Sequence, residues 1–120
     1  MFSLDHVHVV CEDLAVTGDF LELLGARLDR RNEQTLNWEY TLGAVRVFLR
    51  AYREQEARAG QGASPLDHLG FTVADIEAAA ARLLAAGCTV RVPVKRVRPD
   101  LATGFFDGPG GLVVELLQRG

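Results

Sequence analysis

The stretch Leu66-Asp67-His68-Leu69-Gly70-Phe71-Thr72-Val73-Ala74-Asp75 has a near-copy close to the start of the chain. That copy is Leu4-Asp5-His6-Val7-His8-Val9-Val10-Cys11-Glu12-Asp13. In both copies Leu-Asp-His is followed by mostly apolar residues, and an aspartate stands seven positions after the first histidine. Gly25 and Gly87 are separated by the same number of positions as His6 and His68. The chain therefore contains two copies of one unit, and each copy places a histidine early in an apolar run.

The composition is that of an ordinary soluble protein, with 120 residues, 48% hydrophobic and 24% charged. A net charge of −3 gives no reason to expect a nucleic-acid or membrane partner. No apolar run approaches the roughly 18 residues of a spanning helix, and the first strand starts too early for a signal peptide. Cys11 and Cys88 are too few for a cysteine zinc site, and we expect both to be reduced in a cytoplasmic protein.

Apolar alternation predicts a strand over 3–11, and Asp13 can cap a helix that runs to about Leu24. In this helix Leu14, Phe20, Leu21 and Leu24 are expected to form the apolar stripe, and Gly25 to end it. The remaining elements follow by the same criteria: strands over 27–31, 35–42 and 44–51, a linker over 53–65, a strand over 66–74, a helix over 76–86 capped by Asp75, a strand over 88–97 interrupted at Pro93, a strand over 101–106, a turn over 107–111 and a strand over 112–118.

These elements predict a single α+β domain over 1–120 made of two βαβββ modules, with module 1 over 1–52 and module 2 over 66–120. If the modules pack around a pseudo-two-fold axis, equivalent side chains can converge from opposite sides. His6 and His68 are equivalent in this sense. A strand in a core rarely contains a polar ring without a partner. We therefore interpret the two histidines as metal ligands, with a purely structural role as the alternative.

Glu115 is the third candidate ligand, because it stands in the middle of the apolar strand Leu112-Val113-Val114-Glu115-Leu116-Leu117. A carboxylate buried in a strand is costly unless it is paired or bound to a cation. Two imidazoles and one carboxylate suit one divalent Fe, Mn, Ni, Co or Zn ion, with positions left open for substrate. Glu115 is thus a candidate both as a metal ligand and as a catalytic carboxylate.

These motifs, with Leu23-Leu24-Gly25 and the run from Asp107 to Glu115, resemble the vicinal oxygen chelate superfamily. That superfamily includes glyoxalase I, extradiol dioxygenases, methylmalonyl-CoA epimerase, and the fosfomycin and bleomycin resistance proteins. The resemblance covers essentially the whole chain and implies a sheet that curls around a metal site. It also implies metal ligands on the first, fourth, fifth and last strands. By this resemblance the first-strand ligand corresponds to His6, the fifth-strand ligand to His68 and the last-strand ligand to Glu115.

The fourth-strand ligand has no counterpart, because aligning Gly43 with Gly111 places Val47 opposite Glu115. A slip of one residue would instead present Arg46 or Phe48 to the site, and Arg46 would favour an anionic substrate. The tyrosine of extradiol enzymes is replaced by Phe105, and Lys95 stands near a lysine of the fosfomycin enzymes. We expect Arg46, Phe48, Lys95 and Phe105 to be substrate-binding candidates.

His8 lies two positions after His6, so the two side chains are expected on one face of the strand. His8 could be a fourth ligand, a general base or a donor to bound oxygen, or else a histidine satisfied by a backbone carbonyl.

The resemblance implies a metal-dependent enzyme that chelates the oxygens of a small-molecule substrate, with isomerase, lyase, thiol transferase or dioxygenase chemistry. The alternative is a metal-free protein that sequesters a ligand, of the bleomycin-resistance type. In either case we expect a homodimer.

Overall fold

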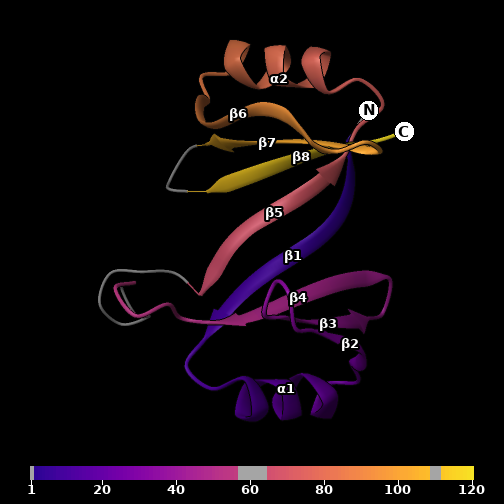
Figure 1. Cartoon of the computed structure of the whole chain (residues 1–120), viewed down its shortest axis with the longest axis vertical. Helices are drawn as coiled ribbons and strands as arrows, with labels where there is room; N and C mark the ends of the chain where they lie inside the picture. The colour runs from indigo at the N-terminus through magenta and orange to yellow at the C-terminus, as the bar shows by residue number, and fades with distance from the viewer. Residues whose placement is uncertain (1, 57–64, 109–111) are drawn as a thin grey trace. The chain divides into compact units, whose positions relative to one another are not determined.

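Each of the two modules folds as strand, helix, strand, strand, strand, which confirms the predicted α+β class and the repeated βαβββ order (Figure 1). The computed structural model describes residues 2–56, 65–108 and 112–120. Module 1 contains β1 (Ser3–Cys11), α1 (Leu14–Leu23), β2 (Arg27–Asn32), β3 (Asn37–Leu42) and β4 (Val45–Ala51). Module 2 contains β5 (Leu66–Thr72), α2 (Ile76–Ala85), β6 (Thr89–Arg98), β7 (Leu101–Asp107) and β8 (Val113–Arg119). Most of the predicted linker (57–64) and part of the predicted 107–111 turn (109–111) lie outside the described residues.

Both helices begin at the predicted residues and end one residue before the predicted ends. The carboxylates of Asp13 and Asp75 accept the backbone N–H groups of Val16 and Ala78, each at 3.1 Å. Gly25 and Gly87 follow the helices with φ of 103° and 98°, the left-handed region that glycine adopts without strain. Within the described ranges, no helix has the length and hydropathy that crossing a membrane requires.

The chain divides into two units, which we call the N-terminal unit (His6–Asp67) and the C-terminal unit (Met1–Asp5 with His68–Gly120). The strand order is β2-β3-β4-β1 in the first and β5-β8-β7-β6 in the second. In each unit the first and last strands of the module, β1 with β4 and β5 with β8, pair in parallel. The other pairings are antiparallel.

Each unit has its own apolar core, to which its helix contributes. In the N-terminal unit Leu14 and Leu21 of α1 pack against a buried cluster built around Tyr40 and Leu49. In the C-terminal unit Ile76 and Ala79 of α2 pack with Phe106 and Leu116. The predicted stripe of α1 was therefore only half right, since Phe20 and Leu24 are 56% and 55% exposed.

β5 ends at Thr72, two residues before the predicted end, and two further strands differ from the prediction for local reasons. β3 begins at Asn37 rather than at residue 35, because the Asn32 side chain accepts the backbone N–H groups of Gln34 and Thr35 and builds a turn. Leu36 then has a φ of 59°, which extended backbone does not allow. β6 is continuous through Pro93, and the predicted interruption is instead a register shift between Val92 and Lys95.

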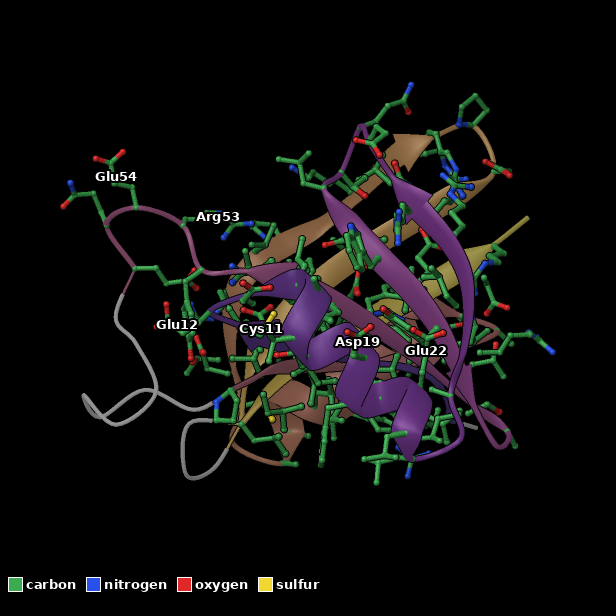
Figure 2. All side chains as sticks on the ribbon, turned by 90° about the horizontal axis from the view of Figure 1, so that it is seen from below. Cys11, Glu12, Asp19, Glu22, Arg53 and Glu54 are labelled. Carbon is green, nitrogen blue, oxygen red and sulfur yellow. The ribbon has the colours of Figure 1, made fainter. Side chains whose placement is uncertain are left out.

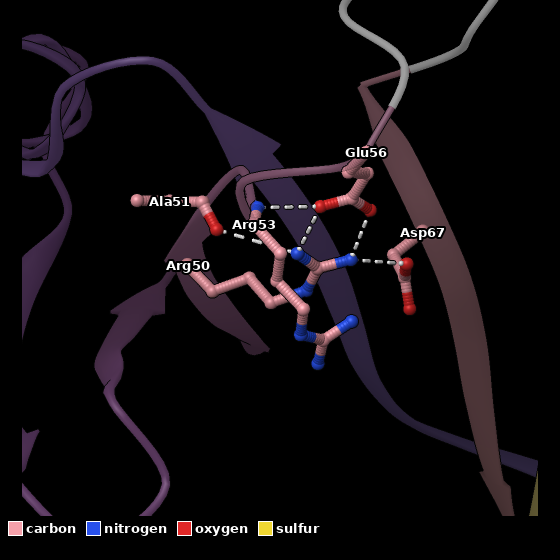
Figure 3. A network of polar contacts seen from close by, with 5 residues as sticks. All are labelled: Arg50, Ala51, Arg53, Glu56 and Asp67. Atoms are coloured by element: carbon pink, nitrogen blue, oxygen red, sulfur yellow. Dashed lines mark hydrogen bonds and ion pairs between the residues drawn. The ribbon is translucent and has the colours of Figure 1, made fainter.

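The aspartate of each Leu-Asp-His copy is held by an arginine at the end of the other module's last strand. Asp67 accepts Arg50 at 2.9 Å, and the same guanidinium binds both oxygens of Glu56 at 2.8 and 2.7 Å (Figure 3). We call this set the Arg50 cluster. Asp5 accepts both Thr72 Oγ1 and Arg119 at 3.1 Å, which we call the Arg119 cluster. Each cluster lies within one unit and fixes the start of a histidine-bearing strand.

Candidate metal-binding site

His68 and Glu115 meet inside the C-terminal unit. β5 and β8 pair in parallel with Gly70 opposite Glu115, so the histidine and the carboxylate emerge on neighbouring strands. The Nε2 atom of His68 lies 3.1 Å from Oε1 of Glu115, and the two side chains are only 6% and 12% exposed. The ring of Phe105 meets the His68 ring edge-on at 5.2 Å and shields it. A buried imidazole nitrogen beside a carboxylate oxygen is a donor pair that divalent transition metals accept.

His6 and His8 share one face of β1 in the N-terminal unit, as predicted. Both are buried, and both contact the ring of Phe48. The His6 ring stacks on Phe48 with a centroid distance of 4.6 Å and an interplanar angle of 19°. The His8 ring meets Phe48 edge-on at 6.1 Å. The Arg46 guanidinium lies 4.9 Å from the centre of the same ring.

The predicted equivalence of Val47 and Glu115 is wrong, and the structure shows the slipped register instead. On β1 and β4 His8 is opposite Phe48, whereas on β5 and β8 the repeat-equivalent Gly70 is opposite Glu115. Phe48 is therefore the counterpart of Glu115. Val47 points to the other face and is buried in the core beneath α1. The alignment on Gly43 and Gly111 failed because turn glycines do not fix strand register.

Glu39 is a carboxylate that the sequence reasoning missed. It lies opposite Phe48 on β3, whereas Phe105 lies opposite Glu115 on β7, so glutamate and phenylalanine have exchanged strands between the modules. Its side chain is 18% exposed and lies 3.6 Å from Arg30 and 3.8 Å from Arg46. The signal was available, since alternation along β3 places residue 39 on the face opposite the buried Tyr40.

The predicted site residues thus fall into two groups and one outlier. The C-terminal unit brings His68, Glu115 and Phe105 together, and the N-terminal unit brings His6, His8, Phe48 and Arg46 together. Lys95 is exposed on β6, opposite the buried Thr103. Arg46 is half-exposed, so its guanidinium can meet a solute.

The family model described as glyoxalase/bleomycin resistance protein/dioxygenase superfamily matches residues 3–116. No curated protein matches the chain. A superfamily member from Vibrio splendidus 12B01 superposes with a TM-score of 0.70 at 19% identity, covering 99% of this chain and 100% of that one.

Two methylmalonyl-CoA epimerases have the same fold. The Mycobacterium tuberculosis enzyme superposes with a TM-score of 0.65 at 23% identity, over 98% of this chain and 87% of that one. The Streptomyces coelicolor enzyme is a single-substitution variant in complex with 2-nitronate-propionyl-CoA. It superposes with a TM-score of 0.62 at 23% identity, covering 98% of this chain and 96% of that one. At this identity the similarity is one of fold.

Proposed function

Because the chain belongs to the glyoxalase/bleomycin resistance protein/dioxygenase superfamily, we propose that it is a small metal-dependent enzyme acting on a small molecule. The observation that carries this proposal is the buried pair of His68 and Glu115, whose ligand atoms are 3.1 Å apart. The reaction is of the isomerase, lyase, thiol transferase or dioxygenase type. A divalent ion supplies Lewis-acid polarisation of substrate oxygens in such sites.

The proposed ligands are His6, His68 and Glu115. His6 qualifies because it is the repeat equivalent of His68 and is almost fully buried, at 3% exposed. Its buried imidazole is of a residue type that commonly supplies a nitrogen ligand to divalent metals. Two histidines and one carboxylate leave open positions for the substrate.

His8 is the proposed proton-transfer residue. It shares the face of His6 one strand repeat further along, so it lies next to one proposed ligand without itself being proposed as a ligand. A histidine next to bound substrate can take and return a proton near neutral pH. The His8→Ala variant is expected to lose turnover while keeping most of its stability and metal content. A His8 ring more than about 8 Å from the bound ion in a metal-loaded crystal structure would contradict this role, since one bridging water cannot span that gap.

Substrate contacts are proposed for Phe48 and Phe105, whose rings lie against the histidines, and for Arg46. The half-exposed guanidinium of Arg46 suits an anionic group on the substrate. Lys95 is proposed as a second cationic contact, supplied from β6. We further propose that the protein is a cytoplasmic homodimer.

Metal content tests the proposal. Purified protein loaded with Co(II), Mn(II), Ni(II), Fe(II) or Zn(II) is expected to retain about one ion per chain after desalting. The His68→Ala and Glu115→Gln variants are expected to lose it, while Asp100→Asn, an exposed carboxylate paired to Arg98, retains it. Failure of every metal to bind would favour the metal-free, ligand-sequestering alternative, for which the aromatic Phe48 at the fourth-strand position is the supporting feature.

A further inference from the structure

The sheet of the N-terminal unit has one face beneath α1 and one face that the helix does not cover. The helix side is acidic, since the exposed carboxylates Asp19 and Glu22 lie on α1 (Figure 2). Glu39 of β3 alternates with the core residue Tyr40 and therefore projects from the other face. Arg30 of β2 and Arg46 of β4 both approach its carboxylate there. Two guanidiniums and one carboxylate thus lie together on the face that α1 leaves uncovered.

Glu39 attracts both guanidiniums without close hydrogen bonds to them. Its oxygens lie 3.6 Å from Nε of Arg30 and 3.8 Å from Nη2 of Arg46, whereas a direct charge-assisted bond measures about 2.7–2.9 Å. Arg50, on the same strand as Arg46, provides the contrast, because it meets its two carboxylates at 2.7 and 2.9 Å and is 8% exposed. Arg30 and Arg46 are 60% and 46% exposed. Arg50 is therefore a structural cation, whereas Arg30 and Arg46 are placed to meet a solute.

The cluster of Arg30, Glu39 and Arg46 carries one surplus positive charge, because two guanidiniums share one carboxylate. The neighbouring Asp29 does not cancel this surplus, since it pairs with Arg27 at 2.8 Å. The attraction of a bound anion to the surplus grows in proportion to the charge of the anion, whereas the cost of desolvating the anion grows with the square of that charge. A surplus of one charge therefore favours a monoanion over a dianion.

Phe48 connects this cluster to one of the proposed metal ligands. The Arg46 guanidinium lies 4.9 Å from the centre of the Phe48 ring, and the His6 ring stacks on the same ring at 4.6 Å. The stacked pair also gives the cluster an apolar flank. An anion held by Arg46 would thus lie one aromatic ring away from His6, within the length of a small organic acid.

We propose that Arg30, Glu39 and Arg46 form a subsite for the single negative charge of an organic carboxylate. Arg30 and Arg46 bind the carboxylate group, and Glu39 sets the specificity by opposing a second negative charge, such as that of a phosphate ester. The inference names the substrate class as a small carboxylic acid, and in that respect it rests on the proposed function. The carboxylate held here is distinct from the oxygens that a metal would chelate.

NMR titration of the full chain with small anions tests the subsite. The protein is first passed over a chelating resin, so that binding is measured apart from any metal. Propionate is expected to shift amide signals of β2, β3 and β4 with a dissociation constant of about 10 mM. Its neutral isostere propionamide should not bind, and methyl phosphate, a dianion at about pH 8, should bind no more tightly than propionate. The absence of a saturable shift up to about 100 mM propionate would overturn the subsite.

Substitution of Glu39 tests its role in specificity. Glu39→Gln removes one negative charge, and the repulsion that it removes scales with the charge of the ligand. The variant should therefore bind propionate about threefold more tightly and methyl phosphate about tenfold more tightly. Equal tightening of both anions would show that charge is not the basis of the selectivity. Weaker binding of both would make Glu39 a support for the arginines and would likewise overturn its proposed role.

The arginines are tested with a neighbour as the control. Arg30→Gln and Arg46→Gln should each weaken propionate binding about fivefold or more. Arg31→Gln removes the same charge at the adjacent position, but Arg31 lies 4.4 Å over the ring of Trp38, which packs on the core beneath α1. At about 0.1 M salt this variant should keep its propionate affinity to within about twofold. If Arg31→Gln weakens binding as much as Arg30→Gln does, the effect is one of net charge and the subsite is wrong.

The same spectra show whether each variant is folded, and metal loading is measured separately. A chain that binds metal but not propionate lacks the subsite while the proposed function stands. A chain that binds propionate with the expected selectivity but takes up no metal has the subsite, and the failure is then that of the proposed metal-dependent enzyme.

Discussion

The two modules place the same Leu-Asp-His sequence in opposite chemical surroundings. His68 meets a carboxylate at 3.1 Å, whereas His6 stacks on an aromatic ring at 4.6 Å. The cause is a single exchange, since the last strand has glutamate at position 115 where β4 has phenylalanine at position 48. A repeated backbone thus supplies two equivalent histidine positions, and one side chain on the neighbouring strand decides the polarity around each.

The two arginine clusters also differ in their surroundings. Arg50 is 8% exposed and binds two carboxylates, whereas Arg119 is 45% exposed and binds Asp5 with help from Thr72. Both hold the aspartate that immediately precedes a candidate ligand. Because Arg50 is buried, losing either side of its cluster leaves charges without a partner, whereas the exposed Arg119 pair is close to neutral in energy.

The largest effect is expected from removing the buried arginine. Arg50→Met should lower the free energy of unfolding by about 3 kcal/mol, because two partly buried carboxylates lose their shared cation. Arg119→Met should cost less than about 1 kcal/mol, as exposed pairs do. Urea unfolding of both variants measures the difference, and equal losses would show that the clusters are equivalent after all.

A smaller loss of stability is expected from adding a side chain at Gly18, in the middle of α1. A Cβ at Gly18 would collide with the hydroxyl of Tyr40, whereas the repeat-equivalent residue on α2 is already Ala80. Gly18→Ala should therefore destabilise by about 1–2 kcal/mol, since overpacking outweighs the gain in helix propensity. Thermal unfolding checks this, with Gly18→Ala in a Tyr40→Phe background as the control that should recover most of the loss.

Making the modules alike should change metal affinity. Phe48→Glu places a carboxylate at the position equivalent to Glu115 and should tighten binding of a divalent ion about tenfold, or about 1.4 kcal/mol. Phe48→Leu removes the ring without adding a ligand and should not tighten it. Competition titration with a chromophoric chelator measures both, and weaker binding by Phe48→Glu would mean that this position does not face the ion.

A further expected effect is a pH dependence that arises in the Arg50 cluster. The Arg50 guanidinium, with the backbone N–H of Arg53, lowers the pKa of Glu56 from 4.5 to about 2. Because the folded pKa lies below the unfolded one, this stabilisation is complete above pH 4.5 and is lost as pH falls from there through about 2. The stability gap between wild type and Glu56→Gln should therefore shrink over that window and stay constant from about pH 5 to 7. A gap that keeps growing as pH falls would contradict the assignment.

The sequence allowed most elements to be predicted to within one or two residues, because the repeat, the two aspartate caps and the two helix-ending glycines are local signals. It could not decide register, since Val47 and Phe48 are adjacent and only the hydrogen-bond partners on β1 show which one faces His8. Glu39 was missed because its strand is mixed in polarity, unlike the apolar strand that made Glu115 conspicuous.

The exposure of Phe20 and Leu24 was also beyond sequence reasoning. α1 is apolar around much of its circumference, and periodicity alone assigns such residues to the core. Only packing against the sheet shows that Leu14 and Leu21 fill the available space, which leaves Phe20 and Leu24 outside.

The central claim is that the two Leu-Asp-His copies supply ligands to one metal ion. An anomalous-diffraction crystal structure of the Mn(II)- or Co(II)-loaded protein tests it most directly. The account predicts one ion bound by imidazole nitrogens of His6 and His68 and by a Glu115 oxygen, each at about 2.0–2.3 Å. An ion bound elsewhere, or these three side chains more than about 6 Å apart with no second copy completing the set, would contradict it.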